Sequence, residues 1–141
     1  MSTISNKKVF FESYSKKLQQ VLESSDWSPI EELADDIQKC WNEGRRVFLC
    51  GNGGSAGNAI HLANDFIYGI AKKTGGGLKA ISLSDNSAVI TCLANDVGYD
   101  YIFSEQLAVQ AEENDLLIVL SGSGNSSNII HAVEQAKKMH V

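Results

Sequence analysis

The sequence predicts an α/β protein with a doubly wound parallel sheet, preceded by two N-terminal helices. From residue 45 onward, apolar runs of strand length alternate with helical patterns in the order βαβαβα, which is typical of a parallel sheet with helices on both faces. Two apolar runs, 47–50 and 116–120, lead into loops of glycine and small polar residues, each followed by a helical pattern. Because such sheets bind ligands beyond the carboxyl ends of their strands, we expect the binding site at these loops.

The first 44 residues carry two amphipathic helical patterns. The second is predicted to begin with Ser28 as N-cap, Pro29 at the first helical position and Glu31 at the third, and to end near Gly44. We expect residues 1–44 to form a helical pair and residues 45–141 an α/β domain, with one domain overall. The apolar stripes could cover each other, the sheet or a second subunit. The stripe of the first pattern, within residues 5–24, consists of Phe10, Tyr14, Leu18, Val21 and Leu22.

The α/β part is predicted element by element from its periodicity and its turn residues. Strands are expected at 47–50, 78–83 and 116–120, and the uninterrupted apolar run at 116–120 predicts a strand buried on both faces. The first long helix should bury Ile60, Ala63, Ile67 and Ile70 and end at the glycines that follow Thr74. The expected helices are 55–71, a segment capped by Ser84, Asp85 or Asn86 that ends before a polar break at 95–100, a short helix at 102–110, and a last helix reaching Met139.

Charge and cysteine content exclude several classes of function. The chain has 12 Lys and Arg against 17 Asp and Glu, a formal net charge of −5, so nothing global attracts nucleic acid or an anionic membrane. Its three cysteines lack CxxC spacing and are predicted to be reduced core residues of a cytoplasmic protein. The longest aliphatic run, 116–120, is too short to cross a bilayer, and the N-terminus has no leader-like apolar region. We therefore expect a soluble cytoplasmic chain that binds neither nucleic acid nor membrane.

The loop 121–126 predicts a phosphate site. It places Ser121, Gly122, Ser123 and Ser126 just before a helix, where backbone N–H groups, hydroxyls and the helix dipole all favour an anion. A monophosphate can be held by such neutral donors without lysine. The Walker pattern is absent, which argues against hydrolysis of nucleoside triphosphates. The alternative is an ordinary serine and glycine turn that caps a helix.

The first loop, 51–56, formally fits the G-x-G-x-x-A pattern of dinucleotide-binding proteins. The acidic residue that binds the ribose should then stand near Lys79 or Ala80, and Asp85 comes late for that role. The dinucleotide-binding alternative is therefore weak.

His61 and Asp65 stand four positions apart in the helix that follows the first loop, so they share one helix face. Such a pair can bind a divalent ion, act as proton donor and acceptor, or simply contact each other. Two ligands do not complete a zinc site, which normally has three or four from the protein. His131 and His140 lack an acidic partner at this spacing and are predicted to be structural or solvated.

Three motifs together make the sequence resemble the sugar isomerase (SIS) domain family and, within it, the phosphoheptose isomerases. They are GNGGSAGNAIHLANDF at 51–66, LAND at 93–96 followed by Gly98, and LSGSGNSSNII at 120–130. Their order and spacing agree with the family over the α/β part, and the two N-terminal helices also fit. The resemblance implies a flavodoxin-like three-layer sandwich, in a homotetramer with active sites at subunit contacts.

The resemblance also implies roles for individual residues. The substrate would be a sugar phosphate, with its phosphate on the loop 121–126. One zinc ion per subunit would bind His61 and Asp65, and Asp65 would act as catalytic base for a ketose–aldose interconversion through an enediol. The expected contacts of the sugar are Asn52, Gly53, Gly54, Ser55, Asn95 and Asp96, and those of the phosphate are Ser121, Gly122, Ser123 and Ser126.

The sequence departs from the family at two places. Asp65 stands where the family usually has glutamate, one methylene longer. The family also continues beyond the position of Val141 with its final strands and a helix whose Gln and His complete the zinc site, so the resemblance implies that these parts are missing here. The expected function is isomerisation of sedoheptulose 7-phosphate for lipopolysaccharide and other surface polysaccharides. The alternatives are a non-catalytic SIS protein that binds the DnaA replication initiator, and a phosphosugar-sensing domain.

Overall fold

The computed structural model describes the backbone of residues 2–141 and the side chains of residues 7–141. It consists of two compact units, residues 1–34 and residues 35–141. Helix α1 (Ser2–Ser24) lies in the first unit, and helix α2 (Ser28–Glu43) begins in the first unit and ends in the second. Among the described residues, no helix combines the length and the apolar character that crossing a bilayer requires.

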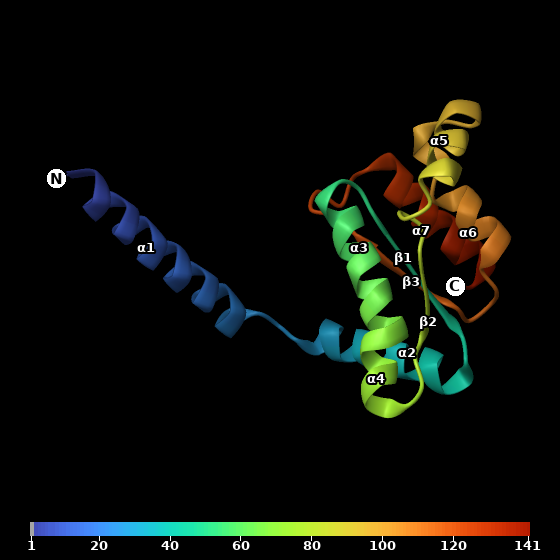
Figure 1. The fold of residues 1–141 in the computed structure, drawn as a ribbon, viewed down its shortest axis with the longest axis horizontal. Helices are drawn as coiled ribbons and strands as arrows, with labels where there is room; N and C mark the ends of the chain where they lie inside the picture. Colours follow the sequence, from blue (N-terminus) through green and yellow to red (C-terminus); the bar gives the residue numbers. More distant parts are fainter. Residues whose placement is uncertain (1) are drawn as a thin grey trace. The chain divides into compact units, whose positions relative to one another are not determined.

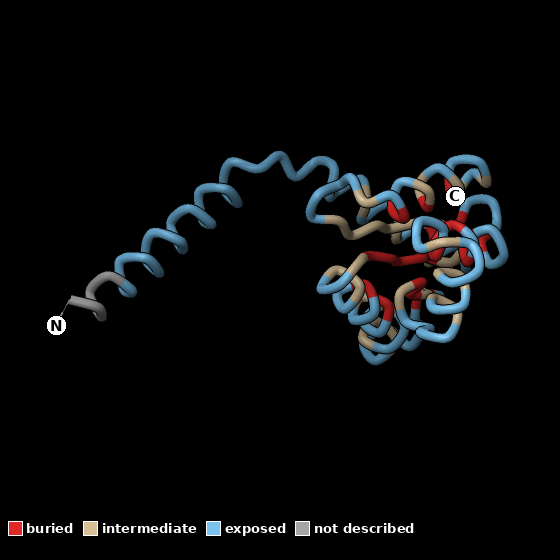
Figure 2. The backbone as a smooth tube through the Cα atoms, turned by 90° about the horizontal axis from the view of Figure 1, so that it is seen from above, coloured by how far each residue is buried: buried red, intermediate tan, exposed pale blue. Residues whose placement is uncertain are grey.

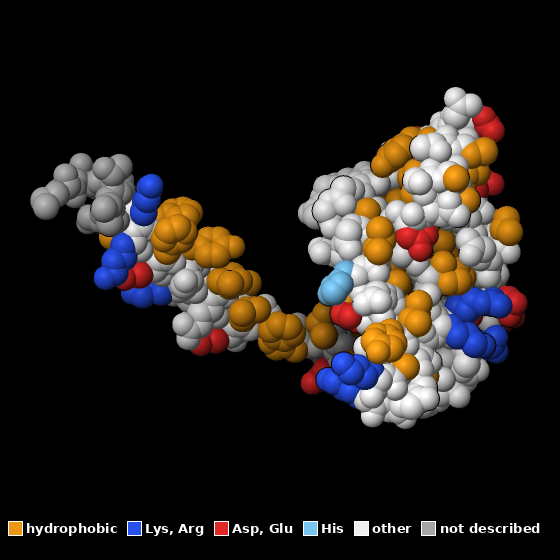
Figure 3. Space-filling view, viewed as in Figure 1, with side chains coloured by type: hydrophobic (Ala, Val, Ile, Leu, Met, Phe, Trp, Pro, Cys, Tyr) orange, Lys and Arg blue, Asp and Glu red, His pale blue; other side chains and the backbone are white. Residues whose placement is uncertain are grey.

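Helix α1 confirms the predicted first helix and leaves its apolar stripe exposed. Phe10 and Tyr14 retain 63% and 61% of their accessible surface, and their rings stack at a centroid distance of 6.4 Å. Figure 3 shows hydrophobic side chains in a row along this helix. Exposed apolar rows of this kind are typical of surfaces that another protein surface covers.

Helix α2 starts one residue earlier than its capping chemistry predicted. The N–H of Glu31 donates to the carbonyl of Trp27 at 3.0 Å, so Ser28 is the first helical residue and not the N-cap. Asp26 takes the capping role instead, because its carboxylate accepts hydrogen bonds from the N–H (3.0 Å) and the hydroxyl (2.8 Å) of Ser28. These bonds lower the pKa of Asp26. The predicted end at Gly44 is confirmed: Gly44 has φ 66°, and the N–H of Arg45 donates to the carbonyl of Cys40 at 2.8 Å.

The three predicted strands are present and form one parallel sheet. They are β1 (Arg46–Gly51), β2 (Lys79–Ser82) and β3 (Leu116–Leu120), in the order β2-β1-β3. Strand β1 pairs with both neighbours, with Leu49 opposite Ser82 and Gly51 opposite Leu120. The carboxyl ends of the three strands therefore lie at one edge of the sheet, as the sequence predicted.

Helices cover both faces of this sheet, which confirms the three-layer α/β fold (Figure 1). Phe48 and Cys50 point into a core formed with α6 and α7, whereas Val47 and Leu49 point into a core formed with α2 and α3. Figure 2 shows how the buried backbone concentrates in the middle of the 35–141 unit. The helices of this unit after β1 are α3 (Gly54–Asn64), the π turn η1 (Asp65–Gly69), α4 (Ile70–Thr74), α5 (Ser87–Asp96), the 3₁₀ turn η2 (Tyr99–Tyr101), α6 (Ser104–Gln110) and α7 (Ser127–Met139).

The burial predictions for β3 and for Ile60 and Ile67 were wrong. Every residue of β3 is half-buried rather than buried on both faces. The reason is that β3 is an edge strand of the three-stranded sheet, in which only β1 has a neighbouring strand on each side. Ile60 and Ile67 are 42% and 50% exposed, and the buried positions of α3 are Ala59 and Ala63. The π turn that begins at Asp65 adds a residue to one helical turn, which shifts the later side chains around the axis.

The cysteine prediction holds for two of the three residues. Cys40 and Cys50 are buried free thiols, and burial raises the pKa of Cys50 to about 12. Cys92 is exposed, contrary to the prediction. Its Sγ lies 3.5 Å from Oδ2 of Asp96, and this hydrogen bond raises the thiol's pKa.

Asp115 joins the starts of β1 and β3, and we expect Asp115→Ala to lower the free energy of unfolding by about 3 kcal/mol. Its buried carboxylate accepts the N–H groups of Arg46 (2.8 Å) and Glu112 (2.9 Å) and lies 3.7 Å from Nη1 of Arg46. The substitution would remove the acceptor of both backbone N–H groups. Urea denaturation measures the change, and Asp85→Ala at an exposed position is the control. Equal midpoints for both variants would contradict this role.

Candidate active site

The carboxyl edge of the sheet is held together by Gly51 and Ser84. The Ser84 hydroxyl accepts the N–H of Gly51 at 3.2 Å and donates to the carbonyl of Gly51 at 3.0 Å, so it joins the end of β1 to the segment after β2. A Cβ on Gly51 would lie 2.7 Å from Cβ of Ser55 and 2.9 Å from the carbonyl oxygen of Leu120. Only glycine lets α3 and β3 approach β1 this closely.

The predicted first loop is a tight turn that leads directly into α3. Gly53 has φ 56° and ψ −121°, a conformation that favours glycine, and the N–H of Ser55 donates to the carbonyl of Asn52 at 3.0 Å. Gly54 is the first residue of α3, and no side-chain hydrogen bond caps this helix. The backbone donors at the start of α3 therefore face the loop, where a ligand oxygen could accept from them.

The Asn52 side chain is held by two residues that sequence reasoning missed. Its Nδ2 donates to Oδ1 of Asn128 at 2.9 Å, and its Oδ1 accepts from Nδ2 of Asn128 at 2.8 Å and from the Tyr99 hydroxyl at 3.1 Å. Asn128 is 2% exposed, a burial that the sequence pattern of the last helix did not indicate. No local signal marked Tyr99, because its contact spans 47 positions.

The second loop presents its serine hydroxyls at the start of α7. Oγ of Ser121 accepts the N–H of Gly124 at 3.1 Å, and Oγ of Ser123 accepts the N–H of Asn125 at 3.2 Å. Both hydroxyls keep their own proton for donation. Ser126 occupies the N-cap position, yet its side chain makes no capping hydrogen bond. Three hydroxyls and the N-terminus of a 13-residue helix thus share one loop, an arrangement suited to an anion.

Asn95 and Asp96 lie in the last turn of α5 and not in the predicted polar break. Nδ2 of Asn95 donates to Oδ1 of Asp96 at 2.7 Å. Within residues 7–141, no side-chain hydrogen bond joins this pair to Asn52 or to the serine loop. The structure therefore brings Asn52 to the second loop through Asn128, but it does not link Asn95 and Asp96 to either loop.

His61 and Asp65 form the expected pair on the outer face of the long helix. Nε2 of His61 lies 3.5 Å from Oδ2 of Asp65, and the side chains are 74% and 52% exposed. Asp65 begins the π turn, which is stabilised from outside because the N–H of Leu78 donates to the carbonyl of Phe66 at 2.9 Å. Such turns are frequent at functional sites. A groove of about 630 Å³ runs beside Asp65, lined also by Trp41, Leu62, Phe66, Gly69, Ile70, Lys73 and Thr74.

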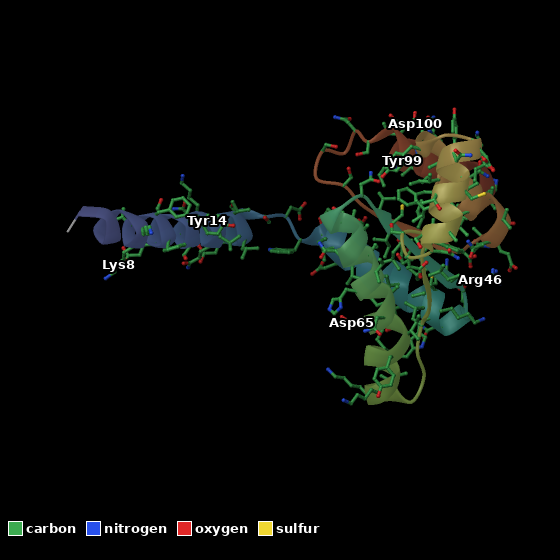
Figure 4. The ribbon with its side chains drawn as sticks, turned by 45° about the horizontal axis from the view of Figure 1, so that its top comes forward. Lys8, Tyr14, Arg46, Asp65, Tyr99 and Asp100 are labelled. Atoms are coloured by element: carbon green, nitrogen blue, oxygen red, sulfur yellow. The ribbon has the colours of Figure 1, made fainter. Side chains whose placement is uncertain are left out.

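The two halves of the candidate site are well separated within one chain. Helix α3 has 11 residues, so Asp65 lies about 16 Å along the helix from the turn at Gly54. Figure 4 shows Asp65 on the long helix and Tyr99, which contacts Asn52, at a distant part of the same unit. Asp65 and the turn at Gly54 thus stand at opposite ends of α3.

The donors present fit part of a zinc site. Adjacent ligands of a tetrahedral zinc ion are about 3.3 Å apart, and the His61–Asp65 separation of 3.5 Å is close to this value. Among the described residues, no group of three or more histidine, cysteine or acidic side chains could hold a metal. A zinc ion held by this pair would therefore need further donors from outside these residues.

His131 has the structural role that was expected. Its ring stacks on Tyr101 at a centroid distance of 4.6 Å, and its Nδ1 lies 3.0 Å from the carbonyl oxygen of Asp100. Because a carbonyl can only accept, Nδ1 carries the proton. His131 thus fastens η2 to α7.

Comparison with known proteins places the chain in a family. The SIS domain model matches residues 9–141. The phosphoheptose isomerase of Fusobacterium nucleatum is 42% identical over 137 residues, which are 97% of this chain and 68% of that protein. That of Thermodesulfovibrio yellowstonii is 44% identical over 111 residues, which are 79% of this chain and 55% of that protein. The chain thus spans little more than half to two thirds of the length of these relatives.

Solved structures give the same result. The phosphoheptose isomerase GmhA from Neisseria gonorrhoeae matches with a TM-score of 0.85 at 30% identity, over 98% of this chain and 71% of that one. A phosphoheptose isomerase from Francisella tularensis matches with a TM-score of 0.86 at 30% identity, over 99% of this chain and 72% of that one. The chain therefore belongs to the SIS domain family and, within it, to the phosphoheptose isomerases.

Proposed function

We propose that this protein isomerises sedoheptulose 7-phosphate to an aldoheptose 7-phosphate, in the cytoplasm, for the synthesis of lipopolysaccharide or another surface polysaccharide. The observation that carries the proposal is the exposed Asp65 carboxylate beside His61, on the helix that follows the first loop. The relatives named phosphoheptose isomerase support it. A sugar-binding domain without catalysis would not need a carboxylate at the wall of an open groove.

Asp65 would move one proton between adjacent carbons of the sugar. Its carboxylate takes a proton from C1 of the ketose, which gives an enediol, and returns it to C2, while the hydroxyl proton of O1 passes to O2. The C1 carbonyl of the aldose forms as the C2 carbonyl is lost, so no oxidant or reductant is consumed. The groove beside Asp65 has room for the sugar, because Gly69 carries no side chain there.

His61 and Asp65 would hold a zinc ion together with donors from outside the described residues. Bound there, the metal would polarise the substrate's oxygen atoms as a Lewis acid. Asp65 contacts His61 and also lines the groove. Asp65 would thus combine the roles of ligand and base.

The serine loop would bind the phosphate, and Asn52, Gly53, Gly54, Ser55, Asn95 and Asp96 would contact the sugar. The hydroxyls of Ser121, Ser123 and Ser126 each keep a proton to donate, and Gly122 is exposed between two of them. Because Asp65 lies about 16 Å along the helix from the turn at Gly54, a second copy would supply one half of each site. A homotetramer would provide such contacts, and the helical pair 1–44, with the exposed apolar stripe of α1, would take part in them.

We expect Ser126→Ala to weaken the binding of sedoheptulose 7-phosphate about 10-fold with almost no loss of stability. Removing an N-cap serine ordinarily costs about 1 kcal/mol, but this hydroxyl caps nothing and is free to meet the phosphate. Calorimetric titration measures the dissociation constant. Ser127→Ala, one position along and exposed, is the matched control and should bind normally. Equal behaviour of the two variants would show that Ser126 does not contact the phosphate.

A non-catalytic role is the second candidate, either as a DnaA-binding regulator of replication or as a phosphosugar sensor. The serine loop alone would suffice for a sensor. Incubation of the protein with sedoheptulose 7-phosphate and zinc separates the candidates, with the aldose measured by chromatography. Formation of an aldoheptose phosphate supports the enzyme. Binding of the sugar phosphate without conversion would favour the sensor instead.

A further inference from the structure

A pair of asparagine side chains joins the two loops of the candidate site. Asn52 follows β1 and Asn128 lies in the first turn of α7, and their carboxamides exchange two hydrogen bonds of 2.9 and 2.8 Å across 76 positions of the chain. Asn128 is 2% exposed, so a misplaced partner would leave a buried amide without hydrogen bonds. The pair therefore fixes the distance between the turn 51–54 and the helix that follows the serine loop.

Tyr99, in the 3₁₀ turn η2, also contacts the Asn52 side chain. Its hydroxyl donates to Oδ1 of Asn52 at 3.1 Å, while 55% of its surface stays exposed. Tyr99 belongs to η2, which the stack of Tyr101 on His131 holds against α7. The hydroxyl is thus kept in place by contacts that do not involve Asn52.

These bonds leave Asn52 with a single free group. Both lone pairs of its Oδ1 are used, by Asn128 and Tyr99, and one of its two Nδ2 protons goes to Asn128. The remaining N–H has no partner within the described residues. Hydrogen bonds that a carbonyl accepts polarise the amide, and this makes the remaining N–H a better donor.

We propose that Asn128 and Tyr99 are positioning residues, which fix the Asn52 carboxamide so that it presents one N–H to an oxygen of the substrate's sugar part. Asn52 then selects a group that accepts a hydrogen bond, a carbonyl or the lone pair of a hydroxyl, and offers it no acceptor in return. The inference rests on the proposed function for the identity of the ligand, a ketose phosphate. It adds two residues that contact Asn52 and not the substrate.

The test is a double-mutant cycle on binding, with Tyr99→Phe, Asn52→Ala and the double variant. Tyr99→Phe removes one hydroxyl from a half-exposed ring and should leave the fold intact. We expect it to weaken the binding of sedoheptulose 7-phosphate about 5-fold in the wild-type background and not at all in the Asn52→Ala background. Inorganic phosphate, which would bind the serine loop alone, should bind the wild type and Tyr99→Phe equally.

Tyr101→Phe is the matched control. It makes the same chemical change within the same turn, and the described residues provide no hydrogen bond to the Tyr101 hydroxyl, so its effect should be nil. The inference would be overturned if the effects of Tyr99→Phe and Asn52→Ala on sugar phosphate binding were independent. It would also be overturned if Tyr99→Phe weakened the binding of inorganic phosphate as much as that of the sugar phosphate. Failure of the sugar phosphate to bind would overturn it as well. Binding without isomerisation would refute the proposed enzyme while the cycle still decides the role of Tyr99.

Discussion

Asp65→Asn should reduce the isomerisation rate by about 1,000-fold, the largest effect on activity that we expect from any single substitution. Asparagine has nearly the same shape and still lies beside His61, but it cannot accept the proton that must leave C1. Its neutral amide is also a weaker ligand for a metal. The rate is measured under saturating sugar phosphate and zinc, so a change in affinity does not enter.

The same variant should bind inorganic phosphate as well as the wild type does. The serine loop lies at the carboxyl edge of the sheet, and Asp65 lies about 16 Å along the helix from that edge. Asp35→Asn, in the exposed part of α2, is the control for the loss of one negative charge and should keep full activity. Near-normal turnover by Asp65→Asn would rule out Asp65 as the base.

Asp65→Glu tests the departure from the family's usual residue. Glutamate restores a carboxylate and extends it by one methylene toward the groove, where the absence of a side chain on Gly69 leaves room. This variant should remain active, in contrast to Asp65→Asn. Asp65→Asn tests whether a carboxylate is needed to accept the proton, and Asp65→Glu tests whether the length of the side chain matters.

The elements that the sequence predicted well are those whose ends are marked by local chemistry. Gly44 ends α2 with a left-handed residue, as expected, and Asn86, one of the three expected candidates, caps α5 by accepting the N–H of Val89 at 3.2 Å. Ser28 failed because Asp26, two positions earlier, competes for the same capping role. Asp26 and Ser28 are close in sequence, but their residue types alone do not show which of them caps α2.

Burial was harder to predict than element type. An apolar run such as 116–120 fits an internal and an edge strand equally well, and only the sheet order distinguishes them. Likewise, the direction in which Ile67 points from the helix depends on the π turn at Asp65, and no residue pattern predicted this turn. These features depend on partners far along the chain, such as the bond from Leu78 to Phe66.

In the candidate site, too, contacts between residues close in sequence could be predicted and contacts between distant residues could not. The His61–Asp65 pair and the serine loop could be predicted because their residues are close in sequence, and the structure brings each set together. The Asn52–Asn128–Tyr99 contacts could not, since they join three separate elements. Sequence reasoning thus identified candidate residues that are close in sequence and missed Asn128 and Tyr99, which hold Asn52 from separate elements.

Gly51→Ala should lower the free energy of unfolding by about 3 kcal/mol, the largest effect on stability that we expect from one added methyl group. The new Cβ would lie 2.7 Å from Cβ of Ser55, 2.8 Å from the backbone carbon of Ser55 and 2.9 Å from the carbonyl oxygen of Leu120. Two of these atoms belong to the backbone, so no side-chain rotation relieves the overlap. Either α3 or β3 must move away from β1.

Gly57→Ala is the matched control, and its effect should have the opposite sign. Gly57 lies within α3, and a Cβ there would meet nothing within 4 Å, so alanine should stabilise the helix by about 0.5–1 kcal/mol. Urea denaturation of both variants measures the difference. If Gly51→Ala were as stable as Gly57→Ala, Ser55 and Leu120 would not lie as close to Gly51 as described. Because the same approach sets the spacing of Asn52 and the serine loop, Gly51→Ala should also weaken sugar phosphate binding, and Gly57→Ala should not.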